Sequence, residues 1–259
     1  MARIFISGSA DGLGLLAGRM LAAQGHEVIL HARSAERAAA ARQALPAHRA
    51  VVVGDASSLP ALRSLADQVN ELGRCDAVIH NVAVGSEPNR VATAEGLSRT
   101  FAVNVVAPYL LTALIEPPQR LIYMSSGMHL GGEPGLEDPQ WERRRWNGSQ
   151  AYSDSKLHDL MIALAVARRW PGVLSNAVNP GWVPTRMGGP GAPDDLEDGA
   201  RTQAWLAVGD DPGARVTGRY LHHQKPAAMH PAAADEGAQD RLLDYLQGIT
   251  GAALPDPRP

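Results

Sequence analysis

The sequence predicts an α/β protein with a doubly wound, mainly parallel sheet of about seven strands, flanked by helices on both faces. Short, nearly continuous apolar runs alternate with longer helix-compatible segments, which is typical of strands that are buried on both faces. A glycine-rich turn also joins the first apolar run to the first helical segment. No repeat or low-complexity linker interrupts the alternation. We therefore expect one domain over 1–259, with a core at about 3–221 and a carboxy-terminal extension at 222–259.

The individual elements follow from the apolar pattern and from the residues that end helices. Gly25 ends the first helical pattern, and Pro108 predicts a bend in a later one. The segment 151–168 is rich in Ala, Leu and Met and contains neither Gly nor Pro, as expected of a long helix. Strands are predicted at 4–6, 27–32, 50–53, 76–79, 120–124 and 174–178, and helices up to 24 and at 35–45, 59–72, 94–115, 151–168 and 235–250. A mobile loop leading into a helix is expected at 186–205, and a loose Pro-rich tail at 255–259.

The composition restricts the functional class. The chain has 24 basic and 27 acidic residues and a formal net charge of −3, which argues against nucleic acid as a partner. Cys75 is the single cysteine, so an intramolecular disulfide is excluded and a reducing compartment is expected. No apolar run approaches the roughly eighteen residues of a membrane span, and no signal-peptide pattern opens the sequence. We expect a soluble, cytoplasmic protein without a membrane partner.

Three glycines, Gly8, Gly12 and Gly14, lie between the first predicted strand and the helix that follows it. Strand, glycine-rich turn, helix and strand within roughly thirty residues form the dinucleotide-binding unit of the Rossmann fold. Glycines permit a tight turn and a close approach of the backbone to a pyrophosphate, which the amides at a helix amino terminus bind. The sequence therefore predicts a nucleotide-binding Rossmann fold.

Tyr152 and Lys156 are four residues apart in the long predicted helix. This spacing places the two side chains on one face, one turn apart. A phenol titrates near ~10 in water, and a neighbouring ammonium favours the phenolate, which suits a phenol to proton transfer. Such pairs are also common without a function. The pair indicates a catalytic role only together with the fold and the cofactor predicted from the rest of the chain.

Taken in order, these motifs resemble the short-chain dehydrogenase/reductase family over residues 3 to about 220. The family's Asn-Asn-Ala-Gly is met only partly, by residues 80–83. The long stretch between Ser126 and Tyr152 resembles the retinol-dehydrogenase-like branch, as does the sequence at 218–220. The residues that match the family's motifs are Gly8, Gly12, Gly14, Asp55, Asn104, Ser126, Tyr152, Lys156, Pro180, Gly181 and Thr185.

The resemblance implies an NAD(P)-dependent oxidoreductase that acts on CH–OH groups. It would move a hydride between nicotinamide and a small, apolar carbonyl or alcohol substrate. Tyr152 would exchange a proton with the substrate oxygen, and Lys156 would support Tyr152 and hydrogen-bond the nicotinamide ribose. Ser126 would hold the substrate oxygen, with the adjacent Ser125 as the alternative. Asn104 would anchor a water that links the lysine to solvent.

The choice of cofactor depends on the end of the second strand. The sequence there has no acidic residue to bind ribose hydroxyls, and it has Arg33, whose guanidinium suits a 2′-phosphate. We therefore expect NADP(H) over NAD(H), the alternative being that Arg33 is only a solvated residue. The residues expected to bind the cofactor are Gly8, Ser9, Asp11, Gly12, Leu13, Gly14, Arg33, Ser34, Asp55, Ala56, Asn81, Val82, Ala83, Tyr152, Lys156, Pro180, Gly181, Val183 and Thr185.

The substrate side is less defined. Met128, His129 and Trp182 follow predicted catalytic strands and are candidates for an apolar pocket. The arginine run between two tryptophans at 141–146 is expected to be a solvated helix with packed Trp rings, in preference to a nucleic-acid or membrane patch. A metal site is not expected, because the histidines at 222, 223 and 230 lack supporting carboxylates or cysteines.

Two further matters stay open. A nucleotide sensor that keeps the fold without turnover is the alternative to an enzyme, although it would not need the Asn, Ser, Tyr and Lys set. The resemblance also implies association as a homodimer or homotetramer through the helix that contains Tyr152 and the helix before it. The added segment ahead of Tyr152 leaves that surface in question.

Overall fold

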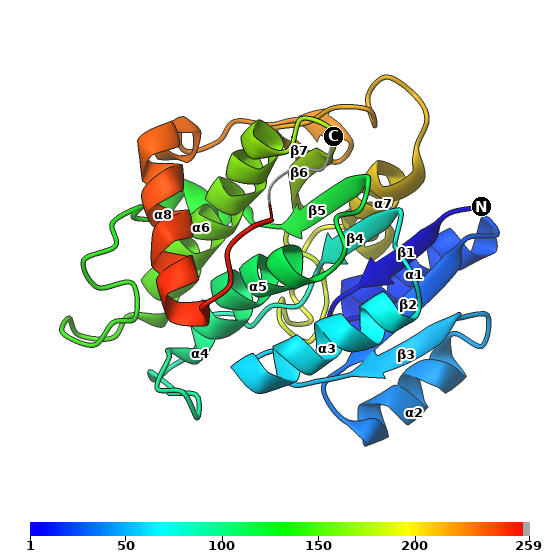
Figure 1. The fold of residues 1–259 in the computed structure, drawn as a ribbon, viewed down its shortest axis with the longest axis horizontal. Coiled ribbons are helices and arrows are strands. Elements are labelled where there is room, and N and C mark those ends of the chain that lie inside the picture. The colour runs from blue at the N-terminus through cyan, green and yellow to red at the C-terminus, as the bar shows by residue number, and fades with distance from the viewer. Residues whose placement is uncertain (256–259) are drawn as a thin grey trace.

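In the computed structural model, which describes residues 1–255, eight strands form one sheet (Figure 1). All neighbouring strands are parallel except the last pair. The predicted α/β class and the parallel sheet are confirmed. The strand order is β3-β2-β1-β4-β5-β6-β7-β8. The strands are β1 (Arg3–Ile6), β2 (Glu27–Ala32), β3 (Ala50–Val53), β4 (Ala77–His80), β5 (Arg120–Met124), β6 (Leu174–Asn179), β7 (Arg219–His222) and β8 (Lys225–Pro226).

Helices cover both faces of the sheet, as expected for parallel strands that are apolar on both sides. The helices are α1 (Gly12–Ala23), α2 (Ala35–Ala44), α3 (Leu59–Glu71), α4 (Arg99–Phe101), α5 (Ala107–Leu114), α6 (Gly148–Arg169), α7 (Leu196–Val208) and α8 (Glu236–Thr250), with a π-helical turn η1 (Ala102–Val106) and 3-10 turns η2 (Gly127–Gly131) and η3 (Pro231–Ala234). One apolar core lies under α1, α2 and α7, and a larger one lies under α3, α5, α6 and α8. Each core is built from the alternate side chains of the same strands.

The strand order reverses direction between β1 and β4, which lie side by side although two strands separate them in sequence. In open α/β sheets, ligands bind at the carboxyl ends of the strands next to such a reversal. The loops after β1, β4, β5 and β6 all leave this edge, and they contain most of the residues predicted to be functional. The topology therefore gathers the predicted site at one edge.

The predicted helix at 94–115 is shorter and less regular than expected. It begins at Arg99, because Gly96 has a φ of +81° in a turn that brings Ala92 against Ser98. Its middle is the π-helical turn η1, which precedes Pro108. A π-helical turn adds a residue to the helix, and such turns are frequent at functional sites.

The eighth strand was not predicted. His223 and Gln224 adopt left-handed backbone conformations, with φ of +47° and +62°, as a two-residue hairpin turn requires. This turn returns the chain antiparallel to β7 as the short strand β8. His222 therefore ends a strand, and its ring stacks on that of His223. Among the described residues, no group of three His, Cys, Asp or Glu side chains is placed to hold a metal ion.

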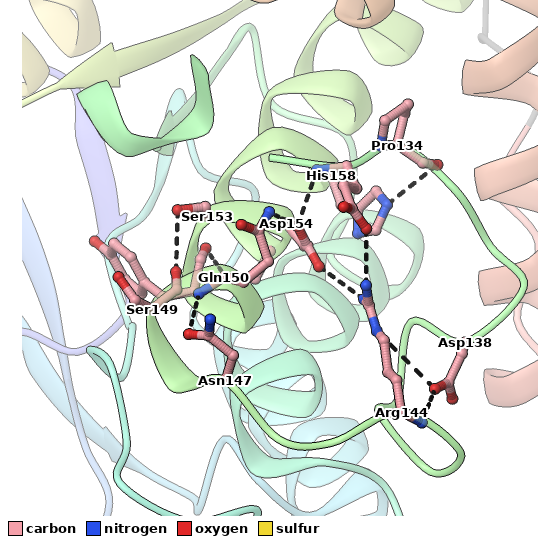
Figure 2. Close-up of polar contacts among 12 residues, drawn as sticks. Pro134, Asp138, Arg144, Asn147, Ser149, Gln150, Ser153, Asp154 and His158 are labelled. Carbon is pink, nitrogen blue, oxygen red and sulfur yellow. Dashed lines mark hydrogen bonds and ion pairs between the residues drawn. The ribbon is translucent and has the colours of Figure 1, made fainter. Parts of the chain in front are cut away.

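The segment between β5 and α6 is attached to α6 by the buried carboxylate of Asp154 (Figure 2). Asp154 accepts hydrogen bonds from the Glu133 amide at 2.9 Å and from Gln150 at 2.8 Å. Its other oxygen is 2.9 Å from the guanidinium of Arg144, which lies 3.6 Å from the centre of the Trp141 ring. Asp154 thus joins three parts of the chain around the first turns of α6.

The helix expected at 141–146 does not form. Asp138 accepts hydrogen bonds from the backbone amides of 142, 143 and 144, and this replaces helical hydrogen bonding there. Trp141 also has a left-handed backbone, with a φ of +56°. The packing of the two tryptophans is as expected: Trp141 is buried, and Trp146 meets it edge to face with ring centres 5.7 Å apart.

The carboxy-terminal segment returns to the body of the molecule, where α8 lies along α6 (Figure 1). Tyr109 donates to the Ala252 carbonyl at 2.7 Å, and Trp170 donates to the Pro255 carbonyl at 2.9 Å. The predicted tail beyond Pro255 lies outside the described residues. In the part of the chain that is described, no helix is long and apolar enough to span a bilayer.

We predict that Asp154→Ala lowers the free energy of unfolding by about 2 kcal/mol, because three charge-assisted hydrogen bonds to a buried carboxylate are lost. Glu133→Ala removes only the exposed partner of Arg144, at 2.8 Å, and should cost less than ~1 kcal/mol. Urea unfolding of both variants measures the difference. Equal losses would show that the Asp154 cluster does not hold the segment.

Candidate active site

The glycine-rich turn after β1 is held in a fixed shape by close packing. Gly8 has a φ of +64°, and a Cβ there would lie 2.7 Å from the Val82 Cα. A Cβ on Gly14 would lie 2.6 Å from the Gly8 carbonyl oxygen. Gly12 is different: it is exposed, and a Cβ there would have only a methyl of Thr185 nearby, at 3.8 Å. The turn is therefore rigid on its inner side and open on its outer side.

The residues after β4 brace this turn. The Ser7 hydroxyl accepts from the amides of Asn81 at 3.0 Å and Val82 at 3.1 Å. The Asn81 side chain donates to the carbonyls of Ser7 and Gly8, at 3.1 and 2.8 Å. Ala83 follows in the same segment and is half-buried. Asn81 and Val82, both predicted cofactor residues, thus touch the predicted phosphate turn directly.

A histidine that the sequence reasoning passed over braces the turn from the other side. His31 is the fifth residue of β2 and is 2% exposed. Its Nδ1 accepts from the Gly8 amide at 2.9 Å, so Nε2 carries the proton and donates to the Gly54 carbonyl at 2.8 Å. A polar residue within an otherwise apolar strand was the available signal.

The other residues predicted near the cofactor lie at the carboxyl ends of β2 and β3. Arg33 is exposed, and Ser34 caps α2 by accepting from the Arg37 amide at 3.3 Å. Asp11 forms an ion pair with Arg37, which compensates the charge of an acid beside the turn. Asp55 is exposed and accepts from the Ser57 amide and hydroxyl, and the adjacent Ala56 is buried.

Tyr152 and Lys156 lie on the first turns of α6, which begins at Gly148, earlier than predicted. Lys156 is 2% exposed, whereas Tyr152 is half-buried. The Lys156 ammonium donates to the Met124 carbonyl at 2.6 Å and lies 5.8 Å from the centre of the Tyr152 ring. The structure therefore brings the pair together against the carboxyl end of β5.

Asn104 lies within η1 and connects it to the same helix. Its Oδ1 accepts from the Val84 amide at 2.8 Å, and its Nδ2 donates to the Val84 carbonyl and to the Ser155 hydroxyl, each at 3.0 Å. Ser155 donates in turn to the Tyr152 carbonyl at 2.7 Å. Both N–H groups of the side chain are engaged with protein atoms, so the second lone pair of Oδ1 is the side-chain group that remains to hold a water.

The two serines after β5 have different surroundings. Ser125 is buried and donates to the Lys156 carbonyl at 2.8 Å. Ser126 is half-buried, and its hydroxyl accepts only a 3.2 Å contact from the Met128 amide. Among the described residues, the Ser126 hydroxyl donates no hydrogen bond, whereas the Ser125 hydroxyl does. This favours Ser126 over Ser125 as the serine that contacts a substrate.

The candidate substrate residues separate into two kinds. Met128 is 42% exposed and Trp182 is 60% exposed. His129 is fully buried: its Nε2 accepts from the His230 amide at 3.1 Å, and its Nδ1 donates to the Ser126 carbonyl at 2.7 Å. Burial lowers the pKa of His129, the largest of the effects on it. The imidazole holds the Ser126 turn in place and does not face the surface.

The loop after β6 folds back onto itself. Asp194 accepts from the Trp182 amide at 2.6 Å, and a Cβ on Gly181 would collide with its carboxylate. Val183 is buried, and Thr185 accepts from the Gly188 amide at 3.1 Å. Of the predicted cofactor residues in this loop, Thr185 approaches the open side of Gly12, whereas Pro180 and Val183 lie against Gly199 of α7.

The family model described as enoyl-(acyl carrier protein) reductase matches residues 8–212. An uncharacterized oxidoreductase of Emericella nidulans is 42% identical over 98% of this chain and 99% of its own. The short-chain dehydrogenase chry4 of Gibberella zeae is 38% identical over 99% of this chain and 100% of its own.

The chain belongs to the short-chain dehydrogenase/reductase family. Human retinol dehydrogenase 13 is 29% identical over 98% of this chain and 86% of its own. A crystal structure of an uncharacterized protein from Mycobacterium paratuberculosis superposes with a TM-score of 0.85, at 26% identity over 98% of this chain and 95% of that one. A blue fluorescent protein from a metagenomic library, solved in complex with NADPH, gives 0.68 at 26% identity over 85% and 95% of the two chains.

Short-chain dehydrogenase/reductases bind NAD(H) or NADP(H), and the turn after β1 fits that group. Asp11, the residue before α1, makes no side-chain cap to the helix, so the amides of the first turn stay available to a phosphate. Gly12 leaves the space in front of them open, whereas a Cβ on Gly8 or Gly14 would collide with the turn's own packing. The residues present therefore fit a dinucleotide.

This short-chain dehydrogenase/reductase has a buried carboxylate near Lys156 that the sequence analysis did not predict. Asp159 lies on α6 one turn beyond Lys156, and its carboxylate is 3% exposed and 4.0 Å from the lysine ammonium. Its other oxygen has no hydrogen-bond partner. Burial raises the pKa of Asp159 to about 7, although Lys156 acts in the opposite direction. Its spacing of three from Lys156 was the signal in the sequence.

The raised pKa of Asp159 predicts a pH dependence of stability. A carboxyl group that holds its proton more tightly when folded stabilises the fold below its unfolded pKa, near 3.8, and this contribution is lost as the pH rises through about 7. Asp159→Asn should remove the loss. The free energy of unfolding of the variant, relative to the wild type, should rise between pH 4 and pH 8 by up to roughly 4 kcal/mol.

Urea titrations at several pH values measure this difference. Asp154→Asn is the matched control, since Asp154 is a buried carboxylate on the same helix that is paired with Arg144. A constant difference between Asp159→Asn and the wild type across this pH range would contradict the assignment.

Proposed function

We propose that this short-chain dehydrogenase/reductase is an NADP(H)-dependent oxidoreductase that interconverts an apolar carbonyl compound and its alcohol, with Tyr152 as acid and base. The observation that supports this most directly is the placement of Tyr152 and Lys156 on the first turns of α6, with the lysine bonded to the end of β5, the strand that precedes Ser126. A bound nicotinamide supplies or accepts the hydride. The chain's own residues then have to position the substrate and move one proton.

Each side chain has a task that follows from its surroundings. Tyr152 is half-buried and can present its hydroxyl to a substrate oxygen, to which it gives a proton in reduction and from which it takes one in oxidation. Ser126 donates to the same oxygen and stabilises the negative charge that develops there. Lys156 holds a positive charge beside the tyrosine and hydrogen-bonds the nicotinamide ribose. Asn104 and Ser155 keep the backbone of Tyr152 in place.

The preference for NADP(H) is supported by the charges at the end of β2. Arg33 is exposed there and has no ion pair with any described residue, whereas Arg37 is paired with Asp11. A free guanidinium at this position suits a 2′-phosphate. The preference for an apolar substrate is supported by large apolar side chains that are exposed after β5 and β6, namely Met128, Leu130, Trp182 and Met187.

Tyr152→Phe should lower the turnover of carbonyl reduction by about 10²–10⁴-fold, because the proton donor is lost while the ring is kept. NADPH affinity should change by less than about twofold. A panel of apolar aldehydes, ketones and quinones, assayed by NADPH oxidation, measures the first quantity, and fluorescence titration measures the second. Tight NADPH binding with equal, background turnover in both proteins would favour a nucleotide sensor.

Arg33→Ala should raise the Michaelis constant for NADPH about tenfold or more, through loss of a charge-assisted contact to the 2′-phosphate, and should leave that for NADH nearly unchanged. Arg42→Ala provides the control, since Arg42 is an exposed arginine in the last turn of α2. An equal effect of Arg33→Ala on the two cofactors would contradict the preference for NADP(H).

A further inference from the structure

His31 makes more contacts with the glycine-rich turn than any predicted cofactor residue except Asn81. Besides the bond from the Gly8 amide to its ring, its backbone amide donates to the Ser9 hydroxyl at 2.8 Å. The Ser9 amide donates to the His31 carbonyl at 3.1 Å. The Ser9 hydroxyl donates in turn to the Ile6 carbonyl at 2.7 Å. One residue of β2 thereby fixes two consecutive residues of the turn.

The second ring nitrogen of His31 reaches the opposite side of the predicted nucleotide site. Nε2 donates to the carbonyl of Gly54, the residue before Asp55. The imidazole therefore spans from the turn expected to hold the phosphates to the segment expected to lie beside the adenine. A bridge of this kind fixes the distance between the two halves of a dinucleotide site.

We propose that His31 is the positioning residue of the dinucleotide site, and that it holds the phosphate turn only while its imidazole is neutral. The proposal rests on the dinucleotide binding proposed above. A protonated ring carries N–H groups at both nitrogens, so Nδ1 can no longer accept from the Gly8 amide. Two N–H groups would then face each other at 2.9 Å.

The turn has no room to relieve this contact. Gly8 is held on its other side by Val82, where even a Cβ would lie 2.7 Å from the Val82 Cα. Its carbonyl is also held by Asn81, at 2.8 Å. Protonation of His31 therefore has to displace the turn as a whole, and the phosphate-binding amides of α1 begin immediately after it. Cofactor affinity should fall when the imidazole gains its proton.

The surroundings of the ring favour the neutral form. Burial lowers the pKa of His31, and the Gly54 carbonyl and the Asp55 carboxylate oppose this less strongly. Toward β1 the ring faces Phe5, with ring centres 6.5 Å apart, and toward the turn it faces Gly8 and Ser9. Asp55, beyond β3, is the charged group among the described residues that acts on it. The pKa of His31 in the folded protein lies below its ordinary value of 6.5. The stability that the neutral ring provides is therefore fully present above pH 6.5 and is lost as the pH falls below it.

The experiment measures the affinity of NAD⁺ and NADP⁺ by calorimetry between pH 5 and pH 8. NAD⁺ is the decisive probe, because the 2′-phosphate of NADP⁺ itself titrates near ~6. His31→Phe replaces the imidazole by an aromatic ring without nitrogens. It should weaken NAD⁺ binding about tenfold at pH 8, as expected when the buried hydrogen bond to the Gly8 amide is lost together with the bridge to Gly54. The affinity of the wild type should fall toward that of His31→Phe as the pH is lowered and the imidazole gains its proton.

Two further variants separate positioning from general damage. His31→Asn keeps a carbonyl acceptor near the Nδ1 position that cannot be protonated, so it should restore most of the affinity at pH 8 and abolish the acid loss. His80→Phe is the matched control, since His80 is also a buried histidine at the end of a strand, but its Nε2 contacts Thr112 instead of the turn. It should bind NAD⁺ as the wild type does at every pH.

The outcomes are distinct. If the wild type binds neither dinucleotide at pH 8, the proposed function fails and this inference fails with it. If the wild type binds but His31→Phe matches His80→Phe, or His31→Asn keeps the acid loss, only the role of His31 is refuted. If His31→Phe does not fold, the comparison of wild type, His31→Asn and His80→Phe decides the matter alone.

Discussion

The reciprocal contact between α6 and the end of β5 is the constraint on which the candidate site depends. The Lys156 ammonium donates to the Met124 carbonyl, and the Ser125 hydroxyl donates to the Lys156 carbonyl. These bonds fix both the rotation of α6 and its position along the strand. Tyr152, one turn earlier, is thereby held at the carboxyl end of β5, with its ring centre 5.8 Å from the lysine ammonium. A helix shifted by one residue would lose both bonds and would turn the phenol away from this edge.

Holding a buried lysine at this position has an electrostatic cost, and the surrounding structure compensates it only in part. The ammonium has one carbonyl acceptor and a carboxylate at 4.0 Å. Asp159 has one oxygen without a partner, which is expensive in a buried site. Deeper in the same core, Thr112 donates to the Pro108 carbonyl and accepts from Tyr123 and His80, so these groups are neutral and mutually bonded. The strained pair is the one beside the proposed chemistry, where perturbed groups concentrate.

Most elements of the fold could be predicted from the sequence. The βαβ unit and six strands were predictable, because buried parallel strands are apolar runs and the glycines mark the turn between strand and helix. The eighth strand was not, since two residues after a left-handed turn have no periodicity. The helix at 141–146 was wrongly predicted because Asp138, several residues upstream, takes over the backbone amides of that segment. Local pattern does not show which side chain will compete for a backbone amide.

The predicted site residues were recognisable as motifs, whereas the residues that support them were not. His31 and Asp159 act through a strand and a helix face that only the tertiary structure brings to the site. His129 shows the converse case: its place after β5 indicated a pocket residue, but its two ring nitrogens bond to the Ser126 carbonyl and the His230 amide. Sequence position identifies the edge of the sheet at which a residue lies. It does not identify the direction in which the side chain points.

The carboxy-terminal helix α8 covers part of the surface of α6. The resemblance implies association through α6 and the helix before it, yet α8 lies along α6, and Tyr245 of α8 meets Phe101 of α4 edge to face. Tyr109 of α5 is bonded to the carbonyl of Ala252, just beyond α8. The carboxy-terminal segment thus covers apolar surface of α4, α5 and α6 within one chain. Association through the part of α6 that α8 covers would require α8 to leave a core in which Leu242 and Leu246 are fully buried.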